Sequence, residues 1–286
     1  MKQLKIVECP RDAMQGIDEF IPTNKKAAYI NQLLKVGFDT IDFGSFVSPE
    51  AIPQLSDTKE VLRQLELSDT QTKLLAIVGN LRGAKEAADF EEVGVLGFPF
   101  SISDTFQSRN INSSIEDSFK RAEELQNHAV KQNKELVIYI SMAFGNPYND
   151  PWNKDIVIEW AYKFHQELEI KTISLSDTIG AAEPDTIDYL FRALIPELPQ
   201  IEFGAHLHST AENWKPRVEA AYNAGCVRFD GAIKGYGGCP MAQDKLTGNM
   251  PTENLLNYFE SQDAVVNLNK DAFEKSIQLA VNTFPL

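Results

Sequence analysis

The stretch KTISLSDTIGAAEPDTIDYLFRALIPELPQIEFGAHLH, residues 171–208, decides the fold. Residues 171–177 have the pattern of a strand, 184–195 that of a helix, and 201–208 that of a second strand. A strand–helix–strand unit indicates a parallel sheet, because parallel neighbours need a crossover connection. The stretch therefore predicts one unit of a parallel α/β fold.

The same alternation runs outward in both directions, which gives eight strands with intervening helices. No Gly-x-Gly-x-x-Gly follows the first strand, so an open doubly wound sheet is disfavoured. We predict an α/β fold, a (β/α)8 barrel with extra C-terminal helices, as one catalytic domain over residues 1–286. The further strands are expected at 4–9, 40–45, 73–79, 93–103, 135–143 and 227–233, and the further helices at 25–37, 57–66, 80–92, 113–133, 154–168, 213–224 and after 252.

Composition narrows the function class. The net charge is −14, which disfavours a nucleic-acid partner, because phosphate binding needs a concentrated basic surface. The sequence has no run of about 18 apolar residues, so no membrane span is predicted. The N-terminus lacks the pattern of a secretory signal. The three cysteines are odd in number and widely spaced, which favours a reducing compartment. We expect a cytoplasmic protein without membrane contact.

Polar residues gather where the predicted strands end. Catalytic groups of a (β/α)8 barrel come from these C-terminal strand ends, so the residues are expected to share one mouth. They are Arg11 and Asp12, Asp42 and Ser45, Ser141, Asp177 and Thr178, and His206 and His208.

His206 and His208 are the strongest metal candidates among these residues. At a spacing of two on a strand, both side chains project to the same face. Two imidazoles with oxygen ligands from other strands suit a divalent ion such as Mg²⁺ or Mn²⁺. The alternative is one core histidine beside one surface histidine.

Other candidates have equally ordinary alternatives. Asp12 is either a hard oxygen ligand or a helix cap, and Arg11 either stabilises a developing negative charge or is solvated. Asp177 either caps a helix or orients a ligand, and Asn249 alone is typical of a turn. In Gly235-Tyr-Gly-Gly-Cys-Pro240, Cys239 is either a reactive thiol or an incidental turn residue, whereas Cys9 and Cys226 are expected to be inert core residues.

With these residues assembled, the chain resembles the 3-hydroxy-3-methylglutaryl-CoA lyase family, within the metal-dependent lyase and Claisen-condensing barrels. The resemblance runs from Lys5 to about Leu256, and the Gly-Cys-Pro loop is its most specific element. The matching motifs are Pro10-Arg-Asp with Gln15, Ser45-Phe-Val-Ser-Pro49 with Pro53-Gln54, Asn110-Ile-Asn112 with Ser114-Ile-Glu116, Asp177-Thr-Ile-Gly180, His206-x-His208, and Gly237-Gly-Cys-Pro240 with Ala242-Gln243 and Gly248-Asn249.

The resemblance implies a metal-dependent retro-Claisen cleavage of an acyl-CoA, with no redox cofactor and a homodimeric assembly. The implied metal ligands are Asp12, His206, His208 and Asn249. Arg11 would stabilise the enolate, and Cys239 would transfer a proton from a loop that closes over the substrate. The catalytic set is expected to include Asp42 and Asp177 as well, with substrate contacts from Gln15, Ser45, Ser174 and Thr178.

Several residues depart from the family pattern. Ala13-Met14 replaces Gly-Leu, Asp42 replaces a Glu that helps to position the arginine, Ser209 replaces an Asp, and Asn146 replaces a Cys. The missing methylene at Asp42 is expected to lengthen its contact with Arg11 or to shift the loop. Two alternatives stay open: a related lyase or aldolase for another hydroxy acid, and an inactive barrel that serves as a binding subunit.

Overall fold

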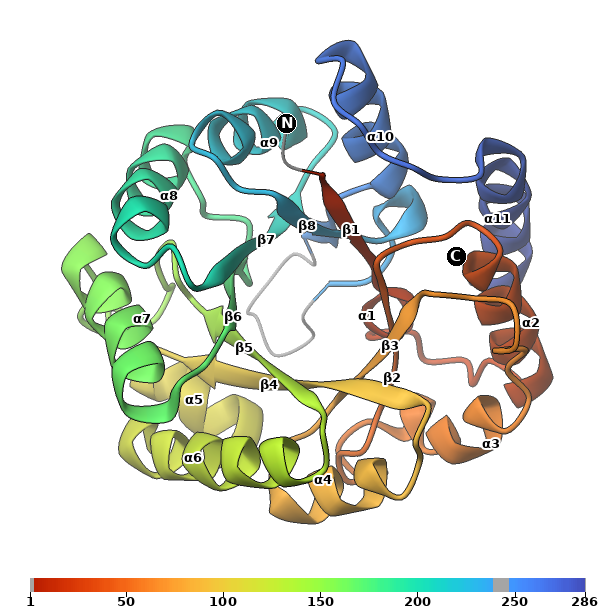
Figure 1. Cartoon of the computed structure of the whole chain (residues 1–286), viewed down its shortest axis with the longest axis horizontal. Helices are drawn as coiled ribbons and strands as arrows, with labels where there is room; N and C mark the ends of the chain where they lie inside the picture. Colours follow the sequence, from red (N-terminus) through yellow and green to blue (C-terminus); the bar gives the residue numbers. More distant parts are fainter. Residues whose placement is uncertain (1–2, 239–246, 286) are drawn as a thin grey trace.

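The computed structural model describes residues 3–238 and 247–285 of the chain. Within them, eight parallel strands close into a barrel, as the sequence predicts (Figure 1). The strands follow one another around the ring in chain order, and pairing of the first with the eighth closes it. They are β1 (Lys5–Glu8), β2 (Thr40–Ser45), β3 (Lys73–Ile77), β4 (Val93–Ser101), β5 (Glu135–Ser141), β6 (Thr172–Asp177), β7 (Glu202–Ser209) and β8 (Arg228–Gly231).

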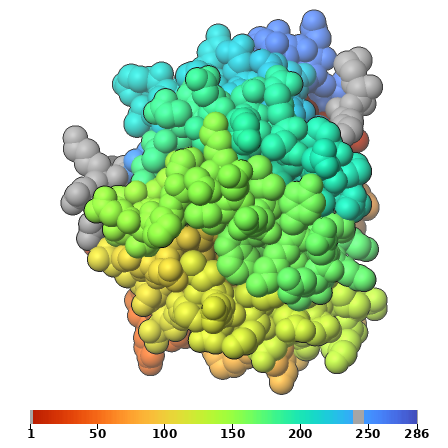
Figure 2. All heavy atoms as spheres, turned by 90° about the vertical axis from the view of Figure 1, so that its left-hand side faces the viewer, coloured from red at the N-terminus to blue at the C-terminus, as the bar shows by residue number. Residues whose placement is uncertain are grey.

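Helices cover the outside of the barrel. Figure 2 shows one outer face, where the yellow and green surface of the middle of the chain forms a continuous cover. The predicted helices are present as α2 (Thr23–Leu34), α3 (Thr58–Leu62), α4 (Leu81–Ala88), α6 (Ile115–Lys131), α7 (Lys154–Leu168), α8 (Pro184–Glu197), α9 (Trp214–Asn223), α10 (Thr252–Ser261) and α11 (Lys270–Thr283). Elements that the sequence did not predict are α1 (Pro10–Ala13), α5 (Asp104–Ile111), the 3-10 helices η1 (Pro53–Leu55) and η2 (Ile233–Gly235), and the short strand β9 (Gly248–Asn249).

Local chemistry fixes where the helices begin. Ser114 caps α6, because its Oγ accepts a hydrogen bond from the backbone amide of Asp117. Asn80 and Asn153 cap α4 and α7 in the same way. Among the described residues no helix has the length and apolar character needed to span a membrane.

The barrel interior is divided into an apolar and a polar part. An apolar cluster fills the side of β3, β4 and β5, and it is separate from the larger core between the sheet and the helices. Acids, histidines and an arginine of the interior lie on β2, β7 and β8: Asp42, His206, His208, Arg228 and Asp230. This division places the polar chemistry on one side of the barrel and an apolar wall opposite it. The apolar interior cluster consists of Leu75, Ile77, Val95, Val137 and Tyr139.

Candidate active site

Two histidines of β7 and Asp12 meet at the C-terminal end of the barrel. The ring centroids of His206 and His208 lie 5.4 Å apart. Asp12 lies in the short helix α1, directly after β1, and its Oδ2 is 4.0 Å from Nε2 of His208. One potential ligand atom from each of the three residues lies within 4.8 Å of the others. The structure thus brings together three of the four candidate ligands.

Asn249 reaches the same place through β9. This strand pairs antiparallel with β7 and sets Asn249 opposite His208. The Nδ2 of Asn249 donates to Oδ2 of Asp12 at 2.7 Å and to the carbonyl of Tyr236 at 2.8 Å. An asparagine binds a metal through its amide oxygen, so ligation by Asn249 requires this amide to turn over.

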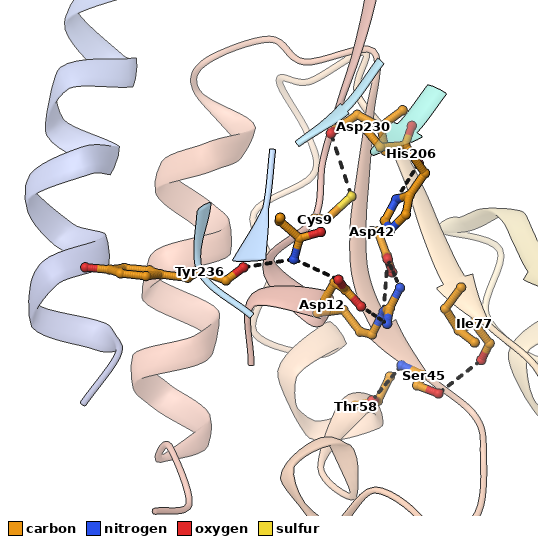
Figure 3. Close-up of polar contacts among 12 residues, drawn as sticks. Cys9, Asp12, Asp42, Ser45, Thr58, Ile77, His206, Asp230 and Tyr236 are labelled. Carbon is orange, nitrogen blue, oxygen red and sulfur yellow. Dashed lines mark hydrogen bonds and ion pairs between the residues drawn. The ribbon is translucent and has the colours of Figure 1, made fainter. Parts of the chain in front are cut away.

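Arg11 lies in a buried ion-pair network beside these residues. Its Nε and Nη2 donate to Oδ2 of Asp42 at 2.9 and 2.5 Å, and its Nη1 donates to Oδ1 of Asp12 at 2.7 Å. Figure 3 draws these contacts of Asp12 and Asp42, with His206 in the same view. The shorter side chain of Asp42 therefore makes a contact of ordinary length with Arg11, and the expected lengthening does not occur.

Electrostatics put Asp12 and His208 in forms that bind metal. Burial opposes ionisation of Asp12, but Arg11 and the two histidines outweigh it and lower the pKa of Asp12 to about 2. Burial and the neighbouring His206 lower the pKa of His208 to about 4. At neutral pH Asp12 is therefore an anion and His208 is neutral, as metal ligation requires. Burial raises the pKa of Asp42 to about 6 against the pull of Arg11, which leaves it ionised at neutral pH.

The cavity next to this cluster has a volume of about 420 Å³. Its wall includes the polar groups named above and a set of apolar side chains from the loops after β1 and β2 and from α5. A mostly apolar pocket with a few convergent polar groups is typical of a small-molecule site. The candidate residues that line it are Arg11, Asp12, Gln15, Thr178, His206 and His208, and the other polar lining includes Tyr139, Ser141 and Ser176.

Other candidate residues lie away from the cavity wall. The Oγ of Ser45 contacts the carbonyl of Ile77 and accepts a hydrogen bond from Val47, so this hydroxyl serves the backbone of the wall (Figure 3). Ser174 is fully buried in the barrel, one inward-facing position below Ser176. Neither Ser45 nor Ser174, both expected to contact the substrate, lines the cavity.

Asp177 is joined to the backbone behind the histidines. Its two carboxylate oxygens accept hydrogen bonds from the amides of Ala181 and Ala182 at 2.8 and 2.9 Å. Arg217 contacts Asp177 at 3.3 Å and donates to the carbonyl of His208 at 2.6 Å. Asp177 thus holds the loop after β6 and, through Arg217, the strand that carries His208.

The loop after β8 begins against Asp12. Gly237 has a φ of +87°, and a Cβ at this position would lie 2.2 Å from the carbonyl oxygen of Asp12. Only glycine permits both the conformation and the approach. Cys239, the proposed proton donor, lies outside the described residues. Cys9 and Cys226 are buried, as predicted, and burial raises the pKa of both thiols.

Sequence reasoning missed Asp230, which lies at the end of β8. Its Oδ2 is 3.2 Å from Nδ1 of His206, and its side chain is buried. Burial disfavours a charged imidazole, but the contact with Asp230 outweighs it and raises the pKa of His206. The acidic residue within the otherwise mostly apolar strand VRFDGAI is the sequence feature that could have identified Asp230.

Fold and site together define a class: a (β/α)8 barrel with a candidate metal centre of two histidines and an aspartate at its C-terminal end. The HMGL-like family model matches residues 3–279 of the chain. The chain belongs to this family, whose enzymes depend on a divalent metal.

Characterised relatives are similar over most of their length. The chain is 33% identical to the hydroxymethylglutaryl-CoA lyase YngG of Bacillus subtilis (strain 168), over 91% of this chain and 85% of the relative. It is 34% identical to the hydroxymethylglutaryl-CoA lyase of Pseudomonas mevalonii, over 90% and 84%.

Solved structures agree with these relatives. The Bacillus subtilis HMG-CoA lyase superimposes with a TM-score of 0.92 at 29% identity, and the match covers 99% of this chain and 94% of the other. An HMG-CoA lyase from Acinetobacter baumannii, in complex with coenzyme A and 3-methylmalate, gives a TM-score of 0.90 at 30% identity over 99% and 91%.

Proposed function

We propose that this chain is a divalent-metal-dependent carbon–carbon lyase that cleaves 3-hydroxy-3-methylglutaryl-CoA to acetyl-CoA and acetoacetate. The observation that carries the proposal is the cluster of Asp12, His206 and His208 beside the 420 Å³ cavity, in a chain of the HMGL-like family. An inactive barrel would have no need to keep these three groups converged.

The residues present fit a divalent metal. Two imidazoles, a carboxylate and an amide oxygen form a donor set that Mg²⁺ or Mn²⁺ accepts, and we propose Asp12, His206, His208 and Asn249 as the ligands. A metal bound there lowers the pKa of the substrate's tertiary hydroxyl and neutralises the charge that develops on its oxygen.

The chain's own residues complete the reaction. Once a base removes the hydroxyl proton, the carbon–carbon bond breaks and releases acetoacetate and the enolate of acetyl-CoA. The enolate then takes up a proton, for which Cys239 is the proposed donor, to give acetyl-CoA. Arg11, fixed by Asp42 and Asp12, lies on the cavity wall, where its cation stabilises that enolate. Gln15 and Thr178 line the cavity and are proposed substrate contacts. Ser45, Ser174 and Asp177 are proposed to act indirectly, through the wall and the strands that they support.

A direct assay tests the function. Purified protein with Mg²⁺ or Mn²⁺ and a thiol reductant is expected to release acetoacetate from 3-hydroxy-3-methylglutaryl-CoA. A panel of other 3-hydroxyacyl-CoA esters and free hydroxy acids distinguishes this lyase from a related lyase or aldolase. Metal-loaded, reduced protein that cleaves no member of the panel would overturn the proposal.

Cys239 has its own test. We expect Cys239→Ala to lower the turnover number strongly while bound metal is unchanged, because the thiol is proposed to move a proton and not to hold the ion. Inductively coupled plasma analysis of the dialysed protein measures the metal. A variant with less metal would show that Cys239 is a ligand instead.

We also propose that residues 1–286 form one catalytic domain, that the protein is a cytoplasmic homodimer, and that its partner is the acyl-CoA substrate and neither nucleic acid nor membrane. The large continuous core, to which residues from Leu4 to Phe284 contribute, supports the single domain.

A further inference from the structure

We propose that Asp230 is the positioning residue of His206: with Arg228 one layer deeper in the barrel, it fixes the imidazole ring and so sets the affinity of the metal site. The inference rests on the proposed metal site. It adds a residue that has no place in the ligand set or in the reaction described above.

The geometry of His206 and Asp230 carries the first step. The two residues lie opposite each other on β7 and β8, and both side chains are directed into the barrel. Nδ1 of His206 lies 3.2 Å from Oδ2 of Asp230, which is fully shielded from solvent (Figure 3). A carboxylate that accepts the Nδ1 proton leaves the Nε2 lone pair for the metal and prevents rotation of the ring.

The layer below explains how Asp230 is held. Arg228 lies two residues earlier on β8, so its side chain enters the interior on the same face. Its Nη1 is 3.6 Å from carboxylate oxygens of both Asp39 and Glu202. Its Nε and Nη2 have no hydrogen-bond partner among the described residues, and neither does Oδ1 of Asp230. Nε and Nη2 of Arg228 are therefore available to donate hydrogen bonds toward Asp230.

Two further hydroxyls face this layer. Tyr139, Ser174, Gly204 and Arg228 occupy one row across β5, β6, β7 and β8. Within the described part of the chain, the hydroxyls of Tyr139 and Ser174 are buried without a partner. An unpaired buried polar group is unfavourable, so this row surrounds Arg228 and the free oxygen of Asp230 with polar groups and not with apolar side chains.

The row is closely packed at Gly204. A Cβ there would lie 3.1 Å from Cδ of Arg228 and 3.2 Å from Oγ of Ser174, so the missing side chain lets both residues approach β7. The ring of Tyr139 meets that of His206 edge to face, at 5.8 Å between centroids. The polar row therefore lies directly beneath the imidazole that the metal would use.

Metal affinity, measured by isothermal titration calorimetry with Mn²⁺ and without any acyl-CoA, tests the inference. We expect Asp230→Asn and Asp230→Ala to raise the dissociation constant about 10- to 100-fold, the usual effect of losing the partner of a metal-bound histidine. Asp39→Asn is the matched control, because it removes another carboxylate near Arg228 without touching His206. The dissociation constant of the control is expected to stay within about twofold of the unmodified protein.

Arg228→Met provides a second test from the layer below. It is expected to weaken Mn²⁺ binding in the same direction as Asp230→Ala, although Arg228 contacts no metal ligand. Near-UV circular dichroism of the metal-free variants checks that the fold is kept. Unchanged Mn²⁺ affinity in folded Asp230→Asn and Asp230→Ala would overturn the inference. Normal Mn²⁺ binding without cleavage of any acyl-CoA would instead sink the proposed function and leave this inference standing.

Discussion

At the scale of single residues, the site is a balance of buried charges. Arg11 contacts two acids, and its charge and the two histidines lower the pKa of Asp12, so that Asp12 stays ionised although it is buried. The sequence predicted Arg11 and Asp12 at the end of the first strand, because strand ends and residue types are local information. It could not predict Asp230 as the partner of His206, because their contact depends on the register between β7 and β8.

The Arg11–Asp42 contact leads to a prediction. Arg11 needs its hydrogen bonds to Asp42 to stay in place, and a hydrogen bond to a charged partner is worth about 1.5–3 kcal/mol. Asp42→Asn is therefore expected to lower the turnover number about 10- to 100-fold. The affinity for Mn²⁺ is expected to change little, because Asp42 is not a proposed ligand. Steady-state kinetics with 3-hydroxy-3-methylglutaryl-CoA and calorimetry measure the two effects. Unaltered turnover in this variant would remove Asp42 from the catalytic machinery.

At the scale of elements, the connection from β8 to α10 is fastened at its base. The amide of Ala232 donates to the carbonyl of Met250 at 3.0 Å, and that of Thr252 donates to the carbonyl of Ala232 at 3.2 Å. Glu8 of β1 accepts from the amide of Ile233 at 2.9 Å and from Oγ1 of Thr252 at 2.6 Å. One buried carboxyl therefore joins both ends of the connection that carries Asn249.

Gly237→Ala tests how this connection meets Asp12. The new methyl group would clash with the carbonyl of Asp12, so Asp12 must move. Mn²⁺ binding is therefore expected to weaken at least tenfold, or by about 1.4 kcal/mol. Gly37→Ala is the control, since Gly37 has a similar φ of +84° with nothing within 4 Å of its Cβ position. The control shares the backbone strain of about 1–2 kcal/mol but is expected to bind Mn²⁺ normally. Equal Mn²⁺ affinity in both variants would show that the close approach of Gly237 to Asp12 does not affect the metal site.

Glu8 gives the fold a pH dependence. Burial raises the pKa of Glu8 to about 8, whereas in the unfolded chain it is near the ordinary 4.5. Between these values the folded state holds one more proton than the unfolded state, so this group's contribution to the free energy of unfolding falls as pH rises. Glu8→Gln cannot ionise, its amide oxygen can still accept from Ile233, and its Nε2 can donate to Oγ1 of Thr252. Its stability relative to the unmodified protein is therefore expected to increase from pH 5 to pH 8, as measured by urea unfolding; a constant difference would refute this assignment.

The sequence predicted the regular elements better than the short ones. All eight strands and the long helices follow from hydrophobic periodicity and caps, which are local. The elements α1, α5 and β9 were not predicted, because each has at most eight residues and forms in contact with distant parts of the chain. β9 pairs with β7, and it is this pairing that sets Asn249 opposite His208.

At the scale of the whole molecule, the candidate metal centre joins β1 and β7 with the segment before α10. Metal that binds the folded barrel alone stabilises it, by about 2.7 kcal/mol when free metal is 100 times the dissociation constant. For a chain of this size we expect Mn²⁺ to raise the melting temperature by about 5 °C, and a chelator to reverse the rise. Differential scanning calorimetry checks this. His206→Ala is expected to keep the fold and lose the shift, and a full shift in this variant would refute the ligand assignment.

The contact between Asn249 and Asp12 spans 237 positions of the chain, and that between Thr252 and Glu8 spans 244. During synthesis, the two halves of the candidate centre can therefore meet only after the residues up to Asn249 have left the ribosome. The complete set of candidate ligands is thus not available to the strand–helix units that emerge before it.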